Sequence, residues 1–359
     1  MRFSAADHAH MARALQLAAY GLTTTSPNPR VGCVIVKDGK IVGEGWHQRT
    51  GTPHAEVHAL QAAGDTARGA TAYVTLEPCS HHGRTPPCAE SLIRAGVARV
   101  VAAMTDPNPL VAGGGIDMLT LAGIEAEVGL MEAEARALNP GFISRMTRQR
   151  PWVRLKTAST LDGKTALANG QSQWITGAAA RADVQRLRAR ACAILTGSGT
   201  VLADNPRMNV RDFDIGRQPL RVVVDSALRT PADAAILPAL IACHHADPAA
   251  RTALEHAGAE VVALPAADGR VDLSALLTLL AQRGVNELHV EAGAGLNGAL
   301  LTAGLVDEWV AYVAPMAAGD SARGLFDHPP LMTLAEAARF RLSDVRAVGN
   351  DLRLTLLPQ

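Results

Sequence analysis

The sequence predicts a protein of two α/β domains. Its 359 residues correspond to about two domains of ordinary size, and the 48% of apolar residues suffice for a core in each. Short β-rich runs alternate with helical patterns in both halves, which is typical of parallel or mixed sheets packed between helices. The basic, proline-bounded segment from Asn139 to Pro151 predicts an exposed linker or a terminal helix turn. We therefore place the domains at residues 1–148 and 149–359.

The first half is predicted to open with an amphipathic helix capped by Ser4, followed by two β-rich runs that flank an Asp38-Gly39 turn. This arrangement is a hairpin signal. The elements expected next are a helix from about Pro53, a strand at 70–78, a helix at 88–96, a strand at 99–106, a helix at 115–123, a strand at 125–130 and a helix at 131–139. Parallel strands place their carboxyl ends, where ligands bind, at one edge of the sheet.

The second half is predicted to open with a strand at 152–160, which begins a new unit. The elements expected after it are a segment at 161–166, a helix at 177–191, strands at 192–201, 220–228 and 259–266, a helix at 272–284, a strand at 286–293, a helix at 296–305 and a strand at 307–315. No internal repeat relates the two halves.

A His-Ala-Glu motif and two later cysteines carry the chemistry of the first half. His54, Cys79 and Cys88 form the ligand set of a catalytic zinc site with one Zn²⁺ per chain, whose open fourth position holds a water of pKa about 7. Glu56 is expected to shuttle a proton from that water to a leaving amine. The H-x-E…P-C arrangement is typical of zinc deaminases, although their two cysteines are separated by two residues. Here residues 80–87 intervene and must form a loop.

The alternative interpretation is a closed structural zinc site or a disulfide between Cys79 and Cys88. In a closed site, Cys33 or His58 would supply the fourth ligand. The catalytic interpretation is preferred because Glu56 accompanies the ligands, and a closed site has no use for this carboxylate.

Composition restricts the partners and the compartment. Lys plus Arg and Asp plus Glu balance at 34 each, and 3% of residues are aromatic, so nucleic-acid binding has little support. No run of about 18 apolar residues predicts a membrane span, and the N-terminus lacks the uninterrupted apolar segment of a signal peptide. The five cysteines are an odd and sparse set, which predicts a reducing compartment and hence a cytoplasmic protein.

Glycines mark the candidate site of the second half. Gly293, Gly295 and Gly298 form a G-x-G-x-x-G motif between a strand ending at Glu291 and a helix, a geometry that seats a pyrophosphate on helix amide groups. No acidic residue about 20 positions later supplies the ribose contact of a Rossmann fold, so a tight glycine-rich turn is the alternative. A second loop of small residues at 196–206 follows another strand, and it predicts the opposite wall of a nucleotide cleft.

Longer segments of both halves resemble the RibD family of bifunctional riboflavin-biosynthesis proteins. In the first half the resemblance is carried by TSPNPRVGCVIVKDG, GTPHAEVHAL, TLEPCSHHGRTPPCAESLI and DPNPLVAGGGIDMLTLAGIEAEVG. In the second half it is carried by VRLKTASTLDGKTA, SQWIT, ILTGSGTVLADNP, RVVVDS and HVEAGAGLNGALL. The resemblance covers about residue 5 to about 345. It implies a cytidine-deaminase-like α/β/α domain followed by a dihydrofolate-reductase-like α/β domain, and the family shares the eight-residue cysteine spacing.

The resemblance implies two successive reactions on a small phosphorylated pyrimidine. The first is zinc-dependent deamination of 2,5-diamino-6-(5-phosphoribosylamino)pyrimidin-4(3H)-one, and the second is NADPH reduction of its ribosyl group to ribityl, giving 5-amino-6-(5-phosphoribitylamino)uracil. It also makes a homo-oligomer plausible. The alternatives are a nucleoside or tRNA deaminase with an accessory domain and a non-enzymatic zinc-binding scaffold. The neutral charge and the second half argue against the former, and Glu56 argues against the latter.

The resemblance also implies site residues, position by position. In the first half it adds Asn28 and His47 as substrate contacts. The implied NADP contacts are Ala158, Trp174, Thr200, Asp204, Ser226, Gly293, Ala294, Gly295, Leu296, Asn297, Gly298 and Ala299. The implied substrate contacts are Ser172, Arg188, Met208, Arg211 and Glu291, and we add Lys156 as a group that binds the ribose or assists proton transfer.

Simpler interpretations stand beside several of these roles. Asn28 could only cap a turn, His47 could be a surface histidine, and Ser226 could only end its strand. Arg188 and Arg211 suit a phosphate dianion, because guanidinium groups bind phosphate oxygens bidentately. Their simpler interpretation is that of solvated helix or loop charges.

Overall fold

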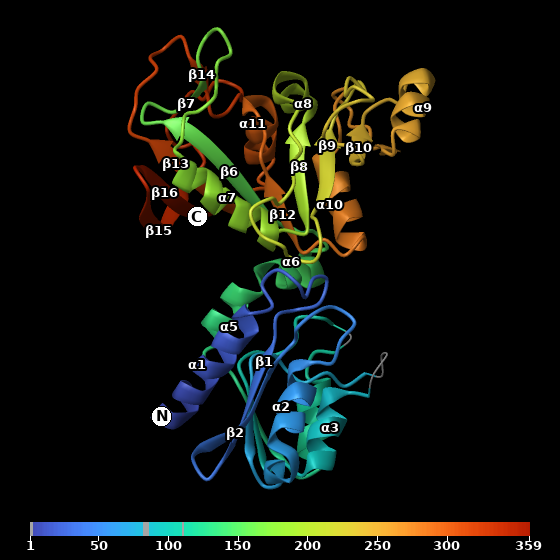
Figure 1. Cartoon of the computed structure of the whole chain (residues 1–359), viewed down its shortest axis with the longest axis vertical. Helices are drawn as coiled ribbons and strands as arrows, with labels where there is room; N and C mark the ends of the chain where they lie inside the picture. The colour runs from blue at the N-terminus through green and yellow to red at the C-terminus, as the bar shows by residue number, and fades with distance from the viewer. Residues whose placement is uncertain (1–2, 82–85, 110) are drawn as a thin grey trace. The chain divides into compact units, whose positions relative to one another are not determined.

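The computed structural model describes residues 3–81, 86–109 and 111–359. The chain divides into two compact units, Met1–Gln149 and Arg150–Gln359, each with its own sheet (Figure 1). Among the described residues, none of the helices combines the length and the apolar character of a membrane span.

The first unit is a mixed five-stranded sheet with helices on both faces. Its elements are α1 (Ala5–Ala19), β1 (Gly32–Lys37), β2 (Lys40–Trp46), α2 (Ala55–Ala63), the 3-10 helix η1 (Gly64–Ala67), β3 (Thr71–Val74), α3 (Cys88–Ala95), β4 (Arg99–Ala102), α4 (Gly114–Leu121), β5 (Glu125–Val128), α5 (Glu132–Leu138) and α6 (Pro140–Arg148). The strand order is β2-β1-β3-β4-β5, with β1 antiparallel to both neighbours and β3, β4 and β5 parallel. In Figure 1, α1 and α5 lie on one side of this sheet and α2 and α3 on the other.

The predicted cap and hairpin of the first unit are confirmed. Ser4 accepts a hydrogen bond from the Asp7 amide while the Asp7 carboxylate accepts one from the Ser4 amide, which forms a capping box at the start of α1. Asp38 and Gly39, with φ values of 50° and 73°, form the tight turn between β1 and β2. Two central residues with positive φ match the right-handed twist of paired strands.

Glycines on β2 allow the backbone of α2 to lie directly on the sheet. A Cβ atom at Gly43 would lie 2.2 Å from the Ala59 carbonyl oxygen, and one at Gly45 would lie 2.4 Å from the Ala55 carbonyl oxygen. Any side chain at these positions would push the helix away. The two glycines therefore fix the start of α2, where His54 and the first candidate site lie.

Of the two alternatives predicted for residues 139–151, the exposed linker is wrong and the helical one is nearer, because most of this segment forms α6. Pro140 occupies the first turn of the helix, where its missing N–H costs nothing, and the side chain of Phe142 is buried in the core of the first unit. The proline thus starts a helix and does not mark a linker.

The second unit is built on a nine-stranded sheet. Its elements are β6 (Trp152–Thr160), β7 (Lys164–Ala166), α7 (Ala178–Arg190), β8 (Ala193–Gly197), α8 (Ser198–Asp204), β9 (Leu220–Val224), β10 (Leu240–Cys243), α9 (Pro248–His256), β11 (Glu260–Ala263), α10 (Leu273–Gln282), β12 (Glu287–Val290), α11 (Ala294–Thr302), β13 (Glu308–Ala314), β14 (Arg323–Gly324), β15 (Phe340–Val348) and β16 (Asp351–Pro358). The strand order is β11-β10-β9-β8-β12-β6-β13-β16-β15, and β7 pairs separately with β14. All strands from β11 to β13 in this order are parallel, whereas β16 and β15 are antiparallel.

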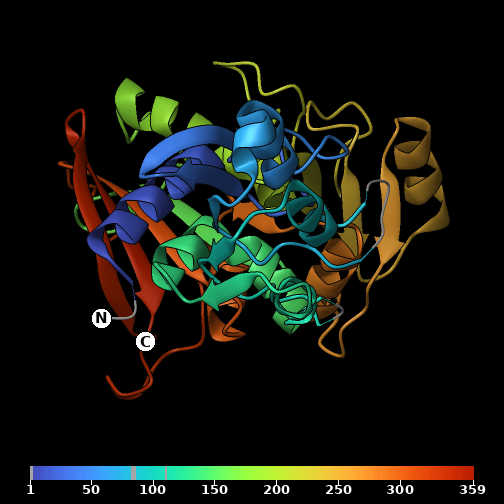
Figure 2. The ribbon, with the colours of Figure 1, turned by 90° about the horizontal axis from the view of Figure 1, so that it is seen from below.

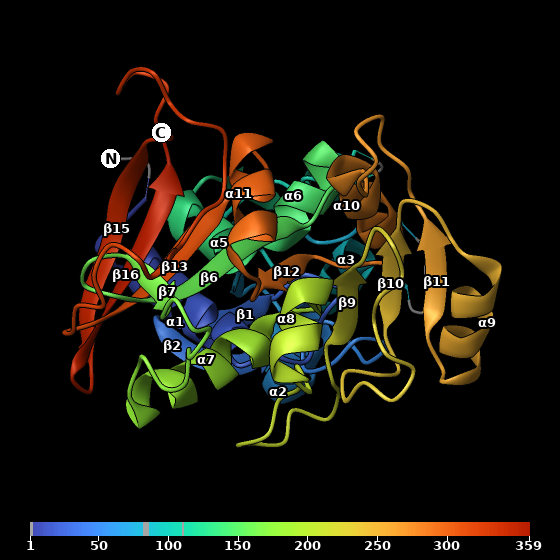
Figure 3. The same ribbon diagram turned by 90° about the horizontal axis from the view of Figure 1, so that it is seen from above.

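Helices cover both faces of this sheet. Leucines of α10 and α11 pack with Leu155 and Leu195 on one face, whereas α8 and α9 pack with Ile194 on the other. Helix α7 packs on β13 through Leu187 and Tyr312. Figure 3 shows α10 and α11 on one side of the sheet and α7 on the other. The hairpin of β15 and β16 and the helix α9 lie at opposite edges, as Figure 2 also shows.

The prediction of a mixed α/β architecture is confirmed, but several elements of the second unit differ from expectation. The strand expected at 192–201 ends at Gly197, and the loop of small residues after it forms the short helix α8. The sequence analysis did not identify β10, α9 or the hairpin of β15 and β16. The hairpin was missed because most β15 side chains are exposed, so its stability comes from pairing with the sheet edge and its sequence lacks a buried face.

Candidate active sites

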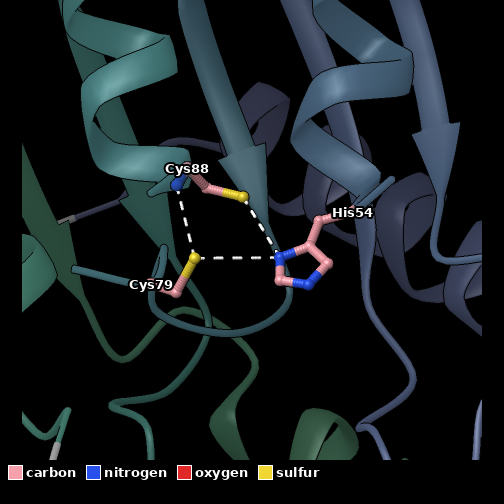
Figure 4. A group of neighbouring side chains, drawn as sticks. All are labelled: His54, Cys79 and Cys88. Atoms are coloured by element: carbon pink, nitrogen blue, oxygen red, sulfur yellow. Dashed lines mark hydrogen bonds between the residues drawn. The ribbon is translucent and has the colours of Figure 1, made fainter. Parts of the chain in front are cut away.

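Three predicted zinc ligands converge in the first unit, as Figure 4 shows. His54 precedes α2, Cys79 lies in the loop after β3, and Cys88 is the first residue of α3. The His54 Nδ1 atom lies 3.7 Å from the Cys79 sulfur and 3.3 Å from the Cys88 sulfur. All three ligand atoms lie within 4.8 Å of one another, close enough for one metal ion. Residues 82–85 of the intervening loop, including Gly83, lie outside the described residues.

The donor set fits zinc. One imidazole nitrogen and two sulfurs are ligands that Zn²⁺ prefers. The Cys88 side chain and amide and the His54 ring hydrogen-bond to Cys79, which lowers the pKa of its thiol and favours the thiolate that binds metal. Neither Cys33 nor His58 belongs to the described cluster, so the fourth ligand of the closed-site alternative is not supplied by them. Cys79 and Cys88 are free thiols, and the disulfide alternative is wrong.

Glu56 lies beside this cluster. Its side chain is on the first turn of α2 and only 3% exposed. Burial raises the pKa of Glu56 to about 7, and the charge of Cys79 contributes in the same direction. A carboxyl group with a pKa near neutrality can both accept and release a proton, as a proton shuttle must.

Asn28 and His47 are joined to each other next to the cluster. His47 is 2% exposed, so the surface-histidine interpretation is wrong. Its Nδ1 atom donates to the Pro53 carbonyl oxygen at 3.2 Å, which leaves Nε2 as the acceptor of a 3.2 Å hydrogen bond from the Asn28 amide. The rings of His47 and His54 lie 5.4 Å apart. Both predicted substrate contacts are therefore adjacent to the metal ligands.

Glu77 is a buried carboxylate of this site that the sequence analysis missed. One of its oxygens accepts hydrogen bonds from the amides of Asp106 and Gly113, and the other accepts from the amides of Gly115 and Ile116, at 2.9 to 3.3 Å. The carboxylate thereby ties the loop before α4 to the end of β3, two residues before Cys79. Its signal was its place in the Glu-Pro-Cys sequence, which the analysis of ligands alone did not use.

Replacing Glu77 with Gln is expected to weaken zinc binding by about 10- to 100-fold, because the loop that presents Cys79 would lose its amide anchor. Competition with a chromophoric zinc chelator measures this change, and circular dichroism verifies folding. The control is Glu134→Gln at an exposed position on α5. An unchanged zinc affinity in Glu77→Gln would contradict the positioning role.

The predicted residues of the second half line one cavity of about 1260 Å³ in the second unit. It opens at the carboxyl ends of β6, β8, β9 and β12, the edge at which parallel sheets bind ligands. The sequence-predicted residues that line it are Lys156, Ala158, Ser172, Trp174, Arg188, Thr200, Asp204, Met208, Arg211, Ser226, Glu291, Gly293, Ala294, Gly295, Leu296, Asn297 and Ala299.

Gly298 is the exception. It is absent from the cavity wall, and a Cβ atom at this position would lie 1.9 Å from the Asp327 carbonyl oxygen. In contrast, a Cβ atom at Gly295 would meet no atom within 4 Å. The last glycine of the motif thus permits close packing of α11 against the chain at Asp327, while Gly295 leaves space on the cavity side.

Glu291 organises a network of charged groups in the cavity. Arg188 donates two hydrogen bonds to its carboxylate, at 2.5 and 3.0 Å, and the His289 ring contributes a third at 3.1 Å. Burial would raise the pKa of Glu291, but the charge of Arg188 and these hydrogen bonds outweigh burial and hold that pKa well below its usual range. Lys156 Nζ lies 4.0 Å from Glu291, and burial lowers the pKa of this ammonium group.

This network changes the interpretation of the two predicted phosphate clamps. Arg188 lines the cavity but is not a solvated charge, because its guanidinium group is paired with Glu291 and also donates to the Asn209 carbonyl oxygen. Arg211 is exposed and lines the cavity. Arg211 is therefore better placed than Arg188 to bind an incoming anion.

Basic residues outnumber acidic ones along the cavity, although the chain as a whole is neutral. The acidic lining residues are Asp204, Glu291 and Asp327, and the basic ones are Lys156, Arg181, Arg188, Arg207, Arg211, Arg229, Arg270 and Arg323. The sequence analysis missed five of these arginines, because their chain positions are dispersed and only the fold brings them together. Such a cavity attracts polyanionic ligands.

Comparisons with known proteins match both units of the chain. The family described as cytidine and deoxycytidylate deaminase zinc-binding region matches residues 4–104. The RibD C-terminal domain family matches residues 151–354, which is more than half of the chain.

Two relatives match nearly the whole length of the chain. The chain is 52% identical to the riboflavin biosynthesis protein RibD of Escherichia coli, over 98% of this chain and 99% of that protein. It is 46% identical to the Haemophilus influenzae RibD, over 100% of this chain and 99% of that protein.

Solved structures give the same result. An Acinetobacter baumannii RibD structure matches with a TM-score of 0.91 and 47% identity, covering 99% of each chain. A Thermotoga maritima protein described as a diaminohydroxyphosphoribosylaminopyrimidine deaminase/5-amino-6-(5-phosphoribosylamino)uracil reductase matches with a TM-score of 0.87 and 34% identity, also covering 99% of each chain. The predicted fold classes of both halves, a deaminase-like and a reductase-like α/β domain, are confirmed.

Proposed function

The chain belongs to the RibD family, and on this premise we propose how its residues carry out two reactions of riboflavin biosynthesis. The protein is a bifunctional enzyme that takes Zn²⁺ in a deaminase domain and NADPH in a reductase domain. We assign residues 1–148 to deamination and residues 149–359 to reduction. The observation that carries the first assignment is the buried Glu56 carboxyl beside a three-ligand cluster.

In the proposed deamination, His54, Cys79 and Cys88 hold the zinc ion. A zinc ion held by three protein ligands activates water for hydrolysis. A carboxyl oxygen of Glu56 accepts the proton of the attacking water and delivers it to the departing amine, so that ammonia leaves the pyrimidine. Asn28 and His47 orient the substrate beside the ligands, which their mutual hydrogen bond supports.

In the proposed reduction, the cavity would hold NADPH, whose chemistry would be to supply the hydride for C1′ of the ribose in its open-chain form. A proton is added to the nitrogen attached to C1′, and Lys156 is the group that assists this transfer, since its lowered pKa makes the ammonium a better acid. Glu291 holds Lys156 near the reacting carbon, and Arg188 in turn fixes Glu291. Arg211 binds the 5′-phosphate of the substrate.

The remaining site residues complete the reductase cavity. Ser172 and Met208 are proposed to contact the substrate. The dinucleotide is proposed to contact Ala158, Trp174, Thr200, Asp204, Ser226 and the cavity-lining residues of 293–299, with its pyrophosphate on the first amides of α11. The basic lining of the cavity supports the proposal that two anionic molecules, the dinucleotide and the substrate, bind there together.

A coupled assay tests the proposed function. Zinc-loaded protein supplied with the diaminopyrimidine ribotide and NADPH is expected to release ammonia first and then to oxidise NADPH, with one equivalent of each per substrate. Ammonia release is followed by a glutamate dehydrogenase reaction and NADPH by its absorbance. Deamination of cytidine or RNA in place of the ribotide would instead favour a nucleoside or tRNA deaminase.

We also propose that the enzyme acts in the cytoplasm as a homo-oligomer on small molecules. The sparse, unpaired cysteines support the compartment. Light scattering of the purified protein measures the oligomeric state.

A further inference from the structure

We propose that His289 is a positioning residue of the reductase site, which fixes the carboxylate of Glu291 so that one of its oxygens faces Lys156. His289 does not itself line the cavity, whereas Glu291 and Lys156 do, so it acts through Glu291. The inference rests on the proposed reductase function and deepens it, because it explains how the group that assists proton transfer is held in place.

His289 lies on the face of β12 that α7 covers. Its neighbours Leu288 and Val290 point to the opposite face, into the core shared with α10 and α11 (Figure 3). Glu287 and Glu291 flank His289 on its own face, and each pairs with an arginine of α7. The side chain of His289 is inaccessible to solvent. A ligand in the cavity therefore cannot compete for its hydrogen bond.

The His289 ring is a neutral donor. Its Nε2 atom lies 3.1 Å from Glu291 Oε1, and its buried Nδ1 atom has no hydrogen-bond partner among the described residues. Burial lowers the pKa of the ring, and the charges of Arg154 on β6 and Arg188 on α7 act in the same direction, against the opposing charge of Glu291. A carboxylate oxygen only accepts, so the single proton of the neutral ring belongs on Nε2.

The two oxygens of Glu291 have different partners. Oε1 accepts from the Arg188 Nε atom at 2.5 Å and from His289 at 3.1 Å, which uses both of its lone pairs. Oε2 accepts from a terminal nitrogen of Arg188 at 3.0 Å and lies 4.0 Å from Lys156 Nζ. The bond from His289 to Oε1 thus leaves Oε2 as the oxygen directed at the ammonium group.

His289 secures Glu291 in a way that Arg188 alone does not. Arg188 lines the cavity, and its guanidinium group is attracted to any anionic ligand that enters. A phosphate that draws Arg188 away would leave the Glu291 carboxylate free to rotate. The bond from His289 comes from the interior of the sheet, so it persists when the cavity is filled.

Lys156 depends on Glu291 for its charge. Burial and the charge of Arg188 lower the pKa of the ammonium group, and Glu291 is the group that opposes them. On β13, the ring centroid of Tyr312 lies 5.9 Å from Lys156 Nζ, but the Tyr312 hydroxyl donates to Asp183 at 2.6 Å. Tyr312 therefore offers Lys156 its ring and not its proton. If Glu291 turned away, the pKa of Lys156 would fall further.

The experiment compares His289→Leu, His289→Gln and the control Leu288→Val with the full-length wild type. Leu fills a similar space without a donor, Gln retains an N–H group, and Leu288→Val changes packing on the opposite face of the same strand. Single-turnover NADPH oxidation with the deaminated intermediate is measured across pH. Calorimetry measures NADPH binding, ammonia release measures deamination, and circular dichroism verifies folding.

His289→Leu is expected to slow the single turnover about tenfold or more, the effect of losing a hydrogen bond to a charged group. The reaction requires the ammonium form of Lys156, so the rate falls as the pH rises through its pKa. Because loss of Glu291 lowers that pKa, the falling limb of the profile should move to lower pH. NADPH affinity and deamination should persist. His289→Gln should restore most of the rate and the position of the limb, and Leu288→Val should leave the limb in place.

NMR of wild-type protein labelled at the histidine ring nitrogens provides a readout without turnover. The His289 signal, identified by its absence from His289→Gln, should show a neutral ring with its proton on Nε2 from about pH 5 to 8. A ring that becomes charged in this range, or that carries its proton on Nδ1, would overturn the proposal. This measurement also decides if His289→Leu does not fold.

Three kinetic results would also overturn the positioning role. A folded His289→Leu with the wild-type rate and pH profile would show that Glu291 needs no such anchor. Equal losses in His289→Leu and His289→Gln, or a moved limb in Leu288→Val, would show a general packing effect. In these cases the reductase function stands, whereas a wild type that does not oxidise NADPH with the deaminated intermediate would remove that function itself.

Discussion

Glu56→Gln is expected to lower the deamination rate by about 10²- to 10⁴-fold, the usual contribution of a positioned general acid or base. The amide of Gln has nearly the shape of the carboxyl group but cannot accept and release the proton. Zinc content should remain at one ion per chain, because Glu56 is not among the three ligand residues. Ammonia release from the diaminopyrimidine ribotide measures the rate, and elemental analysis measures the zinc.

The same variant tests the division of labour between the two units. Given the diaminopyrimidine ribotide, Glu56→Gln should oxidise almost no NADPH, whereas the deaminated intermediate should restore oxidation to the wild-type rate. The matched control is Glu90→Gln on α3 of the same unit, outside the ligand set. Full deamination by Glu56→Gln would contradict the proton-shuttle role. A reductase defect with the deaminated intermediate would contradict the independence of the two sites.

Gly298→Ala is expected to destabilise the reductase unit by about 1–3 kcal/mol, the usual cost of overpacking, and to weaken NADPH binding with it. The added methyl group would overlap the Asp327 carbonyl oxygen, so α11 or the chain at Asp327 must shift. Denaturant unfolding measures the stability, and calorimetry measures the NADPH affinity.

Gly295 provides the matched control, because it lies one helical turn earlier in the same motif. Gly295→Ala should keep or slightly raise the stability, since its methyl group meets no neighbour and Ala favours helix over Gly. Gly295→Val, whose larger side chain extends into the cavity, should weaken NADPH binding while deamination and stability persist. Equal destabilisation by alanine at the two glycines would contradict the packing role of Gly298. A fall in deamination equal to that of reduction would contradict the separation of the sites.

Local sequence patterns were sufficient where one short segment decides the structure. The Asp38-Gly39 turn, the Ser4 cap and the strand at 152–160 depend on neighbouring residues, and the structure confirms them. The basic, proline-bounded segment at 139–151 suggested an exposed linker, but Pro140 is also compatible with the first turn of a helix. Only the packing of Phe142 on the core decides for α6.

The ligand chemistry was also readable from the sequence. A histidine and two cysteines have few common joint uses other than metal binding, and Glu56 two positions after His54 distinguishes a catalytic site from a closed one. The sequence marks Glu77 only by its place before Pro78 and Cys79. Its four partners could not be predicted, because they are backbone amides that lie 29 to 39 positions later. Only the tertiary structure decides which residues lie near Cys79.

The sequence by itself determined the α/β class, the three residues that could hold a metal ion, the carboxyl group beside them and the glycine motif, since each depends on residue type and short spacing. The tertiary structure alone decided that Arg188 pairs with Glu291, that Gly298 serves packing and that dispersed arginines line one cavity. These features depend on distances between residues far apart in the chain. Such distances are set by the order of the strands within a sheet. The residue pattern along a single strand does not encode that order.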